Sequence, residues 1–380
     1  MMELKYPPLE MPWGKRDIPH AIIEVNQHCN IRCKGCYKNK FIIRKSIAEL
    51  KKEVDLAISR RNLSSISFAG GEPMLYSELP EIISYVRNKG IRTILVTNGT
   101  LLNEKIIKNY KSAGLNRIVL HIDKNQNGRP DISSSKITKE SELNNLRKSK
   151  VQLCDKYGID SMLALTLYRD NLDEFQKVIK LAEKLPFSMN SFLITLYSSI
   201  VDYNTTESKA DLTNKESYGF MRNKEGALPV FYVPSQFNNE ELRWLFYHSA
   251  ITKDKTGKVR KIYFHPKHKG ILSFFVKFPR KIKGKYTFDE PRTKKQAYLG
   301  LILYSIFSMS PRTFFKVSKF LFHSFKNKNI KMLSFVFQST PTLKSDGTFD
   351  PCKNCPDATV RNGRLMPVCL ADRISPIKRK

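Results

Sequence analysis

Acidic side chains are scarce in this 380-residue sequence, which has 35 Asp and Glu against 66 Lys and Arg and a formal net charge of +31 at pH 7. Because net charge bears on solubility and partners rather than on fold, this shortage indicates an anionic partner: nucleic acid, a membrane surface or an acidic substrate. Aromatic residues are plentiful at 11%, and hydrophobic residues make up 41%. That supply of apolar side chains excludes a chain that is disordered throughout.

Cysteines and long apolar runs are also in short supply. Seven cysteines are too few for a fold built on disulfides. The longest apolar run, AYLGLILYSIFSM at 297–309, is shorter than the ~20 residues that a membrane-spanning helix needs. The opening run MMELKYPPLEMPWGKRDIPH lacks the apolar stretch of a secretory signal. We therefore predict a cytoplasmic, reducing location, in which clustered cysteines bind metal or act in catalysis.

Strand-like and helix-like segments alternate along the first half of the chain. The predicted strands are His20–Asn26, Ser65–Ala69, Thr93–Thr97, Arg117–Ile122, Ser161–Leu167 and Ser191–Tyr197. The predicted helices are Ser46–Arg60, Glu78–Asn88, Asn103–Ala113, Lys139–Tyr157 and Asn171–Lys184. Parallel neighbours need helical crossovers, so these repeats predict an α/β fold, a partial (β/α)6 TIM-like barrel. Its chemistry is expected at the C-terminal ends of the strands.

The alternation fades after Ile200, and we predict three regions. Residues 1–200 form the barrel core, 201–345 form a basic, aromatic-rich insertion or extension, and 346–380 form a cysteine-containing tail. The segment 201–226 is polar and predicts a long loop, and the C-terminal extension as a whole is expected to be α-rich. Residues 255–345 hold 21 Lys and Arg against two acids, Asp289 and Glu290.

A first group of cysteines, Cys29, Cys33 and Cys36, stands in the run CNIRCKGCY directly after the first predicted strand. Three thiolates on one tight loop can hold three irons of a 4Fe–4S cube and leave the fourth iron open to a ligand's amine and carboxylate. The alternatives are buried cysteines without metal, or a zinc site. Structural zinc sites usually take four ligands in paired spacing, and the neighbouring His28 is poorly placed to complete one.

Further candidate binding residues follow the next three strands. They are Gly70, Gly71, Glu72, Asn98, His121 and Asp123. The glycine pair lets backbone approach a ligand closely, and the adjoining carboxylate can accept from an ammonium group. The carboxylate after the fourth strand can accept from ribose hydroxyls. Taken singly, each of these short runs is typical of a turn or a surface cap.

Together the cysteine spacing and the GGEP run resemble the radical S-adenosylmethionine (SAM) superfamily over about residues 20–200. The resemblance implies that the three cysteines bind a 4Fe–4S cluster and that Gly70, Gly71 and Glu72 contact the methionine part of SAM, with Asn98, His121 and Asp123 nearer the ribose. It also implies reductive cleavage of SAM to methionine and a 5′-deoxyadenosyl radical, with an electron donor such as flavodoxin or ferredoxin. Many members have an aromatic residue before the third cysteine, where this sequence has Gly35 followed by Tyr37.

A second group of cysteines lies near the C-terminus in a C-x2-C-x13-C spacing. Its members are Cys352, Cys355 and Cys369. The tail resembles the SPASM-like and twitch-like auxiliary-cluster tails of radical SAM enzymes, although those carry more cysteines with other gaps. A second 4Fe–4S cluster, a zinc site and ordinary thiols all remain open, with Asp350 or Asp357 able to complete a metal site. Cys154 lies within a predicted helix, which indicates a buried apolar role.

The segment 299–337 is basic and rich in aromatic residues. Phe314, Val317, Leu321 and Phe325 recur in it at helical spacing, with lysines interleaved. Such a helix can lie in a membrane interface, or it can pack its apolar face on the core and keep a solvated basic face. No acid occurs between Pro291 and Ser345, which favours an anionic membrane surface. We rank nucleic acid below the membrane, because no RNA-binding module signature is present.

The predicted function is that of a radical SAM enzyme, an oxidoreductase or a transferase, acting on a lipid or isoprenoid at the membrane surface. GGEP and the run VLHID are similar to the radical SAM enzyme that adds an adenosyl group to hopanoid precursors. The alternatives are a peptide- or protein-modifying maturase, an RNA-modifying radical SAM enzyme, and a non-catalytic metal-binding protein. The location predicted with this function is cytoplasmic with peripheral membrane contact.

Overall fold

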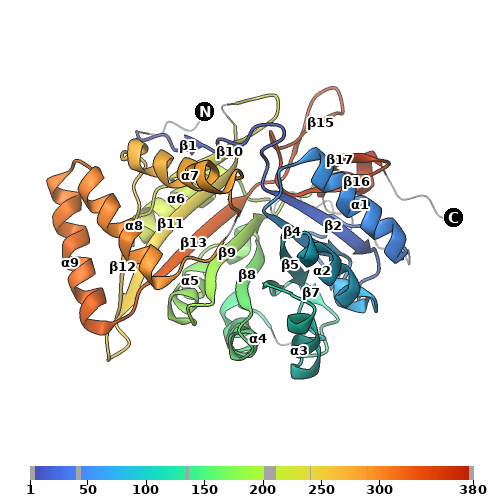
Figure 1. Ribbon diagram of the computed structural model, residues 1–380, viewed down its shortest axis with the longest axis horizontal. Helices are drawn as coiled ribbons and strands as arrows, with labels where there is room; N and C mark the ends of the chain where they lie inside the picture. The colour runs from blue at the N-terminus through green and yellow to red at the C-terminus, as the bar shows by residue number, and fades with distance from the viewer. Residues whose placement is uncertain are drawn as a thin grey trace.

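The computed structural model describes residues 5–39, 44–132, 137–200, 211–239, 241–288 and 290–375. Its centre is a run of parallel strands, each hydrogen-bonded to the next. These strands are β2 (His20–Asn26), β4 (Ser65–Gly70), β5 (Arg92–Thr97), β6 (Arg117–His121), β8 (Asp160–Leu167) and β9 (Met189–Leu196). They coincide with the predicted strands to within two residues at each end, and the partial barrel is confirmed (Figure 1).

Helices connect these strands and cover the outer face of the sheet. They are α1 (Ile47–Arg60), α2 (Leu79–Asn88), α3 (Glu104–Ser112), α4 (Asn144–Lys156) and α5 (Phe175–Lys184), with short turns η1 (Pro73–Leu75), η3 (Glu140–Leu143) and η4 (Arg169–Asn171). The apolar stripes of the helices and the outward-facing strand residues form one core cluster. Ser46 and Glu49 form the expected capping box at the start of α1. Cys154 is fully buried in this core, as predicted.

The sheet continues beyond β9 into the region that we expected to be an insertion. Strand β13 (Lys331–Gln338) pairs in parallel with β9, and β11 (Leu242–Lys253) pairs antiparallel with β13. The remaining strands of this sheet are β1 (Leu9–Glu10), β10 (Phe231–Pro234) and β12 (Val259–Tyr263). Residues 331–337, placed in the amphipathic segment by sequence, are therefore buried sheet. The region adds strands to the barrel core as well as helices.

The predicted loop at 201–226 is partly wrong. Residues 201–210 lie outside the described residues, but α6 (Asn214–Glu225) is helical. Thr213 and Glu216 form a capping box, and Gly226 ends the helix in the left-handed conformation. These are recognisable start and stop signals. The helix was missed because its sequence is mostly polar and the apolar residues show only weak helical periodicity.

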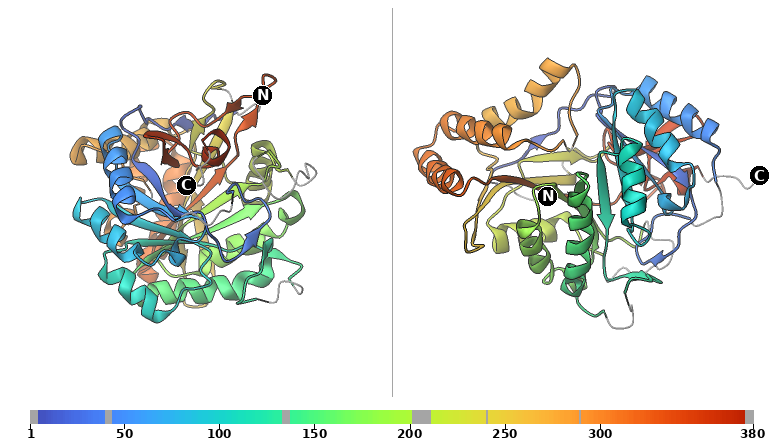
Figure 2. Two further views of the ribbon diagram at one scale, coloured as in Figure 1. Left: turned by 90° about the vertical axis from the view of Figure 1, so that its right-hand side faces the viewer. Right: turned by 60° about the horizontal axis from the view of Figure 1, so that its bottom comes forward.

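Three basic helices project from the side of the molecule remote from β2 (Figures 1 and 2). They are α7 (Lys269–Lys283), α8 (Lys294–Phe307) and α9 (Pro311–Asn327). The four residues predicted at helical spacing all lie on α9 but differ in burial: Val317 and Leu321 are buried, while Phe314 and Phe325 are about half exposed. The middle of the predicted stripe therefore packs on the core, and its two ends are partly exposed to solvent. Within the described part of the chain, no helix is long and apolar enough to cross a bilayer.

The C-terminal tail consists mainly of hairpins rather than helices. Its elements are β14 (Thr342–Leu343), β15 (Phe349–Asp350), β16 (Ala358–Arg361), β17 (Arg364–Pro367) and the short α10 (Ala371–Ile374). The β16–β17 hairpin lies against β2 and α1 (Figure 1). The tail therefore returns to the beginning of the barrel, which brings both cysteine groups to the same side of the sheet.

Candidate active site

The first cysteine group occupies the loop that leaves the C-terminal end of β2. Cys29, Cys33 and Cys36 are partly buried and form no disulfide. Strand β3 (Arg32–Cys33) in this loop pairs with β7 (Gln126–Asn127), which follows β6. The loop backbone is thus held across the carboxyl ends of the strands, where the sequence placed the chemistry.

Two tyrosines that the sequence did not single out hold the middle of the cysteine loop. The Tyr168 hydroxyl donates to the Lys34 carbonyl at 2.6 Å, and the Tyr168 and Tyr197 rings stack at 4.7 Å. Gly35 has φ of +75°, and a Cβ there would lie 3.0 Å from both tyrosines. An aromatic residue before the third cysteine has no room here, which accounts for the glycine. The tyrosines follow β8 and β9, which was the only sequence signal for them.

The glycine pair after β4 packs directly on the start of the cysteine loop. A Cβ at Gly70 would lie 2.1 Å from the Asn26 carbonyl oxygen, and one at Gly71 would lie 2.0 Å from that of His28. The backbone donates into the same loop, because Glu72 N–H bonds the His28 carbonyl at 2.7 Å. Glycine is therefore required at both positions to join β4 to the cysteine loop, whatever ligand it also meets.

The Glu72 carboxylate, which we predicted to accept from the ammonium group of SAM, accepts hydrogen bonds within the protein. The side chain is fully buried and accepts from Thr97 Oγ1 at 2.7 Å, Asn98 N–H at 2.9 Å and Met74 N–H at 3.0 Å. Burial raises its pKa, and these hydrogen bonds oppose that rise. Glu72 thus joins the ends of β4 and β5 as a positioning residue.

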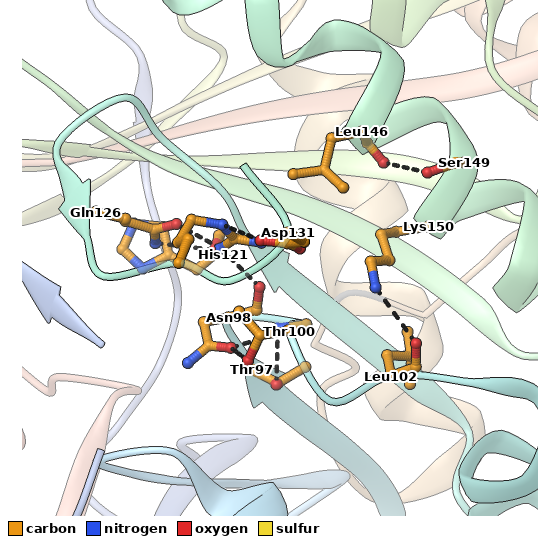
Figure 3. Close-up of polar contacts among 12 residues, drawn as sticks. Thr97, Asn98, Thr100, Leu102, His121, Gln126, Asp131, Leu146, Ser149 and Lys150 are labelled. Atoms are coloured by element: carbon orange, nitrogen blue, oxygen red, sulfur yellow. Dashed lines mark hydrogen bonds and ion pairs between the residues drawn. The ribbon is translucent and has the colours of Figure 1, made fainter. Parts of the chain in front are cut away.

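Asn98 links the end of β5 to the cysteine loop. Its Nδ2 donates to Asn30 Oδ1 at 2.9 Å, and its Oδ1 accepts from Thr100 N–H at 2.9 Å. Its carbonyl accepts from Arg129 Nη1 at 2.9 Å. Figure 3 shows Asn98 with Thr97 and Thr100 at this turn, below His121 and Gln126 of the neighbouring loop. The Asn98 amide is therefore committed to local structure.

His121 and Asp123 also differ from the expectation of a ribose-facing pair. Asp123 is fully buried; its carboxylate accepts from Asn125 N–H at 2.9 Å and lies 3.1 Å from His121 Nε2. His121 keeps 32% of its side chain exposed and lies 3.3 Å from Thr166 Oγ1. Of the two side chains, only His121 can reach a ligand without rearrangement.

The second cysteine group gathers around buried polar side chains. Cys352 and Cys355 are buried and Cys369 is partly buried, and none is in a disulfide. A hydrogen bond with Cys352, burial, and the nearby Asp357 and Cys369 raise the pKa of the Cys355 thiol. The spacing in sequence therefore corresponds to proximity in space.

The two aspartates proposed to complete this group differ in availability. Asp350 accepts from Ser235 Oγ and from Phe237 N–H at 3.2 Å, so its carboxylate is occupied. Asp357 accepts only from Gln338 Nε2 at 3.0 Å among the described hydrogen bonds, and burial raises its pKa to about 6. Asp357 is the better candidate of the two. Among the described residues, no group of three or more His, Cys, Asp and Glu side chains stands ready to hold a metal ion.

A buried charge cluster holds the C-terminal tail on the cysteine loop. Lys38 Nζ lies 2.5 Å from Glu24 Oε1 and 2.7 Å from Asp372 Oδ2. Arg361 pairs with the same two carboxylates. Tyr37 follows Cys36 and packs in the apolar cluster that contains Val368, the residue before Cys369. Burial and the nearby charges of Glu24, Cys36, Asp357 and Cys369 raise its pKa. The two groups are therefore neighbours across one tyrosine.

Comparison with known proteins agrees with this geometry. The Fe-coproporphyrin III synthase of Methanosarcina barkeri is 27% identical over 184 residues, which is 47% of this chain and 45% of the relative. The AdoMet-dependent heme synthase of Nitratidesulfovibrio vulgaris is 30% identical over 172 residues, 43% of this chain and 44% of the relative. This chain thus spans less than half the length of either. The hopanoid similarity stays a prediction.

Among solved structures, Streptococcus suis SuiB bound to precursor peptide SuiA overlaps 57% of this chain and 48% of its own, with a TM-score of 0.43 and 14% identity. That partial overlap adds nothing to the fold already evident from the strand order. The radical SAM superfamily model matches residues 23–182, which span the cysteine loop, GGEP and β2 to α5. Members of this superfamily are enzymes. The chain therefore carries a radical SAM domain over residues 23–182.

Proposed function

We propose that this protein is a radical SAM enzyme that cleaves SAM reductively and modifies a lipid or isoprenoid at a membrane surface. A radical SAM domain implies a 4Fe–4S cluster and SAM, and Cys29, Cys33 and Cys36 would hold the cluster. The donor set fits: three thiols free of disulfides lie on one loop, and Gly70 and Gly71 pack against its start. The main support for the proposal is that the glycine pair packs directly against the start of the loop that holds the three cysteines.

The chain's own residues build and orient the site. The bound cluster and SAM supply the electron transfer and radical chemistry. Glu72 and Asn98 fix the loops after β4 and β5, and Tyr168 fixes the cysteine loop from β8. His121 is the partly exposed polar side chain at this edge that can contact SAM. Flavodoxin or ferredoxin is the electron donor that we expect.

The cluster assignment is tested by anaerobic reconstitution with iron and sulfide, followed by dithionite and SAM. Wild-type protein should form 5′-deoxyadenosine, and the Cys29→Ala, Cys33→Ala, Cys36→Ala triple variant should form none. Cys154→Ala is the matched control, because that cysteine is buried in α4 away from the loop. Robust cleavage by the triple variant would sink the assignment.

A second cluster at Cys352, Cys355 and Cys369 is part of the proposal. It is supported by the proximity of the three thiols and by their place across Tyr37 from Cys36. Replacing all three by Ala should remove about half of the iron and leave SAM cleavage by the first cluster measurable. If wild-type and variant hold equal iron and neither holds zinc, there is no metal at the tail.

The lipid part of the proposal is supported by the surface of α7, α8 and α9. Large apolar side chains there are strongly exposed, among them Ile282, Phe307, Phe315 and Phe322. The same helices carry many lysines and arginines and no acid, and basic residues near an anionic bilayer contribute about 1 kcal/mol each. An exposed apolar patch rimmed by positive charge is the chemistry of a peripheral membrane surface.

A further inference from the structure

A large cavity lies against the inner face of the sheet. Its volume is about 240 Å³, far above the ~10–15 Å³ that a cavity needs to hold one water. The wall is mostly apolar and includes Ile94 and Val119 on the parallel strands and Phe246 on β11. Native interiors leave few voids of this size, so the cavity has the character of a binding site rather than a packing defect.

The cavity reaches from the basic helices toward the candidate active site. On one side its wall includes Leu272 and Val276 of α7. On the other it includes Ile22 and Val96, and these two also pack in the apolar cluster that contains Tyr37, the residue after Cys36. A chain lying in the cavity would therefore extend from α7 toward the cysteine loop.

Helix α7 separates this cavity from the exposed surface of the basic helices. Its residues Leu272 and Val276 line the cavity, whereas its residues Phe274, Phe278 and Ile282 are exposed. Helix α7 thus presents apolar side chains both to the cavity and to the outer surface of the protein.

One guanidinium, that of Arg292, lines this mostly apolar wall. Arg292 is exposed and lines the cavity, its guanidinium lies 5.8 Å from the centroid of the Phe275 ring on α7, and desolvation lowers its pKa. The two carboxylates of the wall are engaged elsewhere: Glu290 pairs with Lys283 at 2.7 Å, and Asp357 accepts from Gln338 at 3.0 Å. Among the described residues, no carboxylate forms an ion pair with Arg292. A guanidinium in such surroundings favours an incoming anion.

We propose that the cavity binds the hydrocarbon chain of an amphiphilic substrate and that Arg292 binds its acidic head group. The inference rests on the proposed function, because it states where and by which chemistry the lipid substrate is held. Binding in this sense directs the chain toward Val96 and the cysteine loop and leaves the charged end near α7. Carboxylate and phosphate head groups share the required charge.

The test uses the full-length protein and the fluorescent long-chain fatty acid cis-parinaric acid, with parinaryl alcohol as its uncharged analogue. Wild-type protein should bind both. Arg292→Gln should weaken binding of the acid about tenfold, the loss of one charge-assisted contact, and leave the alcohol unchanged. Arg312→Gln is the matched control, since that arginine is exposed on α9. Met162 on β8 also lines the cavity. Met162→Trp and, independently, Val119→Phe should abolish binding of both probes by filling the cavity.

The outcomes separate this inference from the proposed function. Unchanged binding by folded Met162→Trp and Val119→Phe proteins, shown by wild-type circular dichroism, would place the probe elsewhere and overturn the inference. Equal loss of acid and alcohol binding in Arg292→Gln would overturn the role of the head group. SAM cleavage with dithionite is measured separately, on wild-type protein. Its absence in wild-type protein would refute the proposed function instead.

Discussion

Single residues at the ends of β4 and β5 explain how the site is assembled. Gly70, Gly71, Glu72 and Asn98 are predicted to meet SAM, and all four make close contacts within the protein. Their first role is to fix the cysteine loop against the sheet. A loop held in advance loses less conformational entropy when a cofactor binds. These residues therefore fix the geometry of the loop to which we expect SAM to bind.

Gly71→Ala tests this role. The added methyl group would lie 2.0 Å from the His28 carbonyl oxygen, and backbone cannot give way cheaply. We expect a loss of about 1–3 kcal/mol in stability, as for overpacked sites, together with poor cluster reconstitution. Gly219→Ala on α6 is the control, because nothing lies within 4 Å of its Cβ position. Urea denaturation that shows equal midpoints for both variants would contradict the packing argument.

At the scale of elements, the barrel was predictable and its continuation was not. Strands β2 to β9 carry short apolar runs separated by capped helices, so local periodicity sufficed. Strand β13 was hidden, because LSFVF follows two amphipathic helices and pairs with β9 across more than a hundred residues. Register across such a distance is set by tertiary packing, which no local pattern reports.

In the candidate site, too, residues with a local sequence pattern were predictable and residues that act through distant contacts were not. The thiols and glycines were found because their spacing is local. Tyr168, Tyr197 and Lys38 were missed because each acts through contacts remote in sequence, such as the Lys38–Asp372 pair. The inward orientation of the Glu72 and Asp123 carboxylates was likewise undetermined by sequence, since a turn can present such a side chain to solvent or to its own backbone.

The junction of β13 and α5 gives a prediction on pH. Lys331 is buried and donates to the Ala182 carbonyl at 2.8 Å and the Leu185 carbonyl at 3.2 Å, at the end of α5. Burial, aided by Lys253, lowers its pKa from 10.5 to about 7. Between the folded-state pKa of about 7 and the ordinary value of 10.5, the unfolded chain binds one more proton at Lys331 than the folded protein does. The free energy of unfolding therefore rises with pH across this range, and that gain is lost as pH falls to about 7.

Wild-type protein should therefore gain stability between pH 7 and pH 9.5, and Lys331→Met should lose that part of the gain. The comparison of slopes isolates Lys331, because other groups titrate alike in both proteins. Thermal melts at the two pH values measure it. Parallel slopes for the two proteins would show that Lys331 is not titrating in this range.

At the scale of the whole molecule, the tail and the barrel depend on one buried charge cluster. Lys38 on the cysteine loop and Arg361 in the tail share the carboxylates of Glu24 and Asp372 (Figure 2, left, shows the tail beside β2). Removing one member of a buried cluster leaves an unpaired charge, which costs far more than breaking a surface pair. The cluster thus couples the placement of the second cysteine group to the first.

Lys38→Met should lower the free energy of unfolding by about 3–5 kcal/mol. The control is Lys51→Met, because Lys51 pairs with Glu81 at the surface, and such pairs are worth about 0–1 kcal/mol. Urea denaturation of both variants gives the comparison. Similar losses in the two proteins would mean that the cluster does not hold the tail.

The projecting helices α7, α8 and α9 give the molecule one face suited to a bilayer. Purified protein should co-sediment with vesicles that contain anionic lipid and bind neutral vesicles weakly. The electrostatic part should fall as salt rises, because surface potential is screened over about 10 Å at 0.1 M. Replacing the exposed Phe307, Phe315 and Phe322 by Ser should abolish binding even at low salt and leave the melting temperature unchanged. Phe320→Ser is the matched control: that side chain is 4% exposed, so its loss should lower the melting temperature instead. If the triple variant still binds vesicles at high salt, the exposed apolar side chains do not contact lipid and the membrane role has lost its basis.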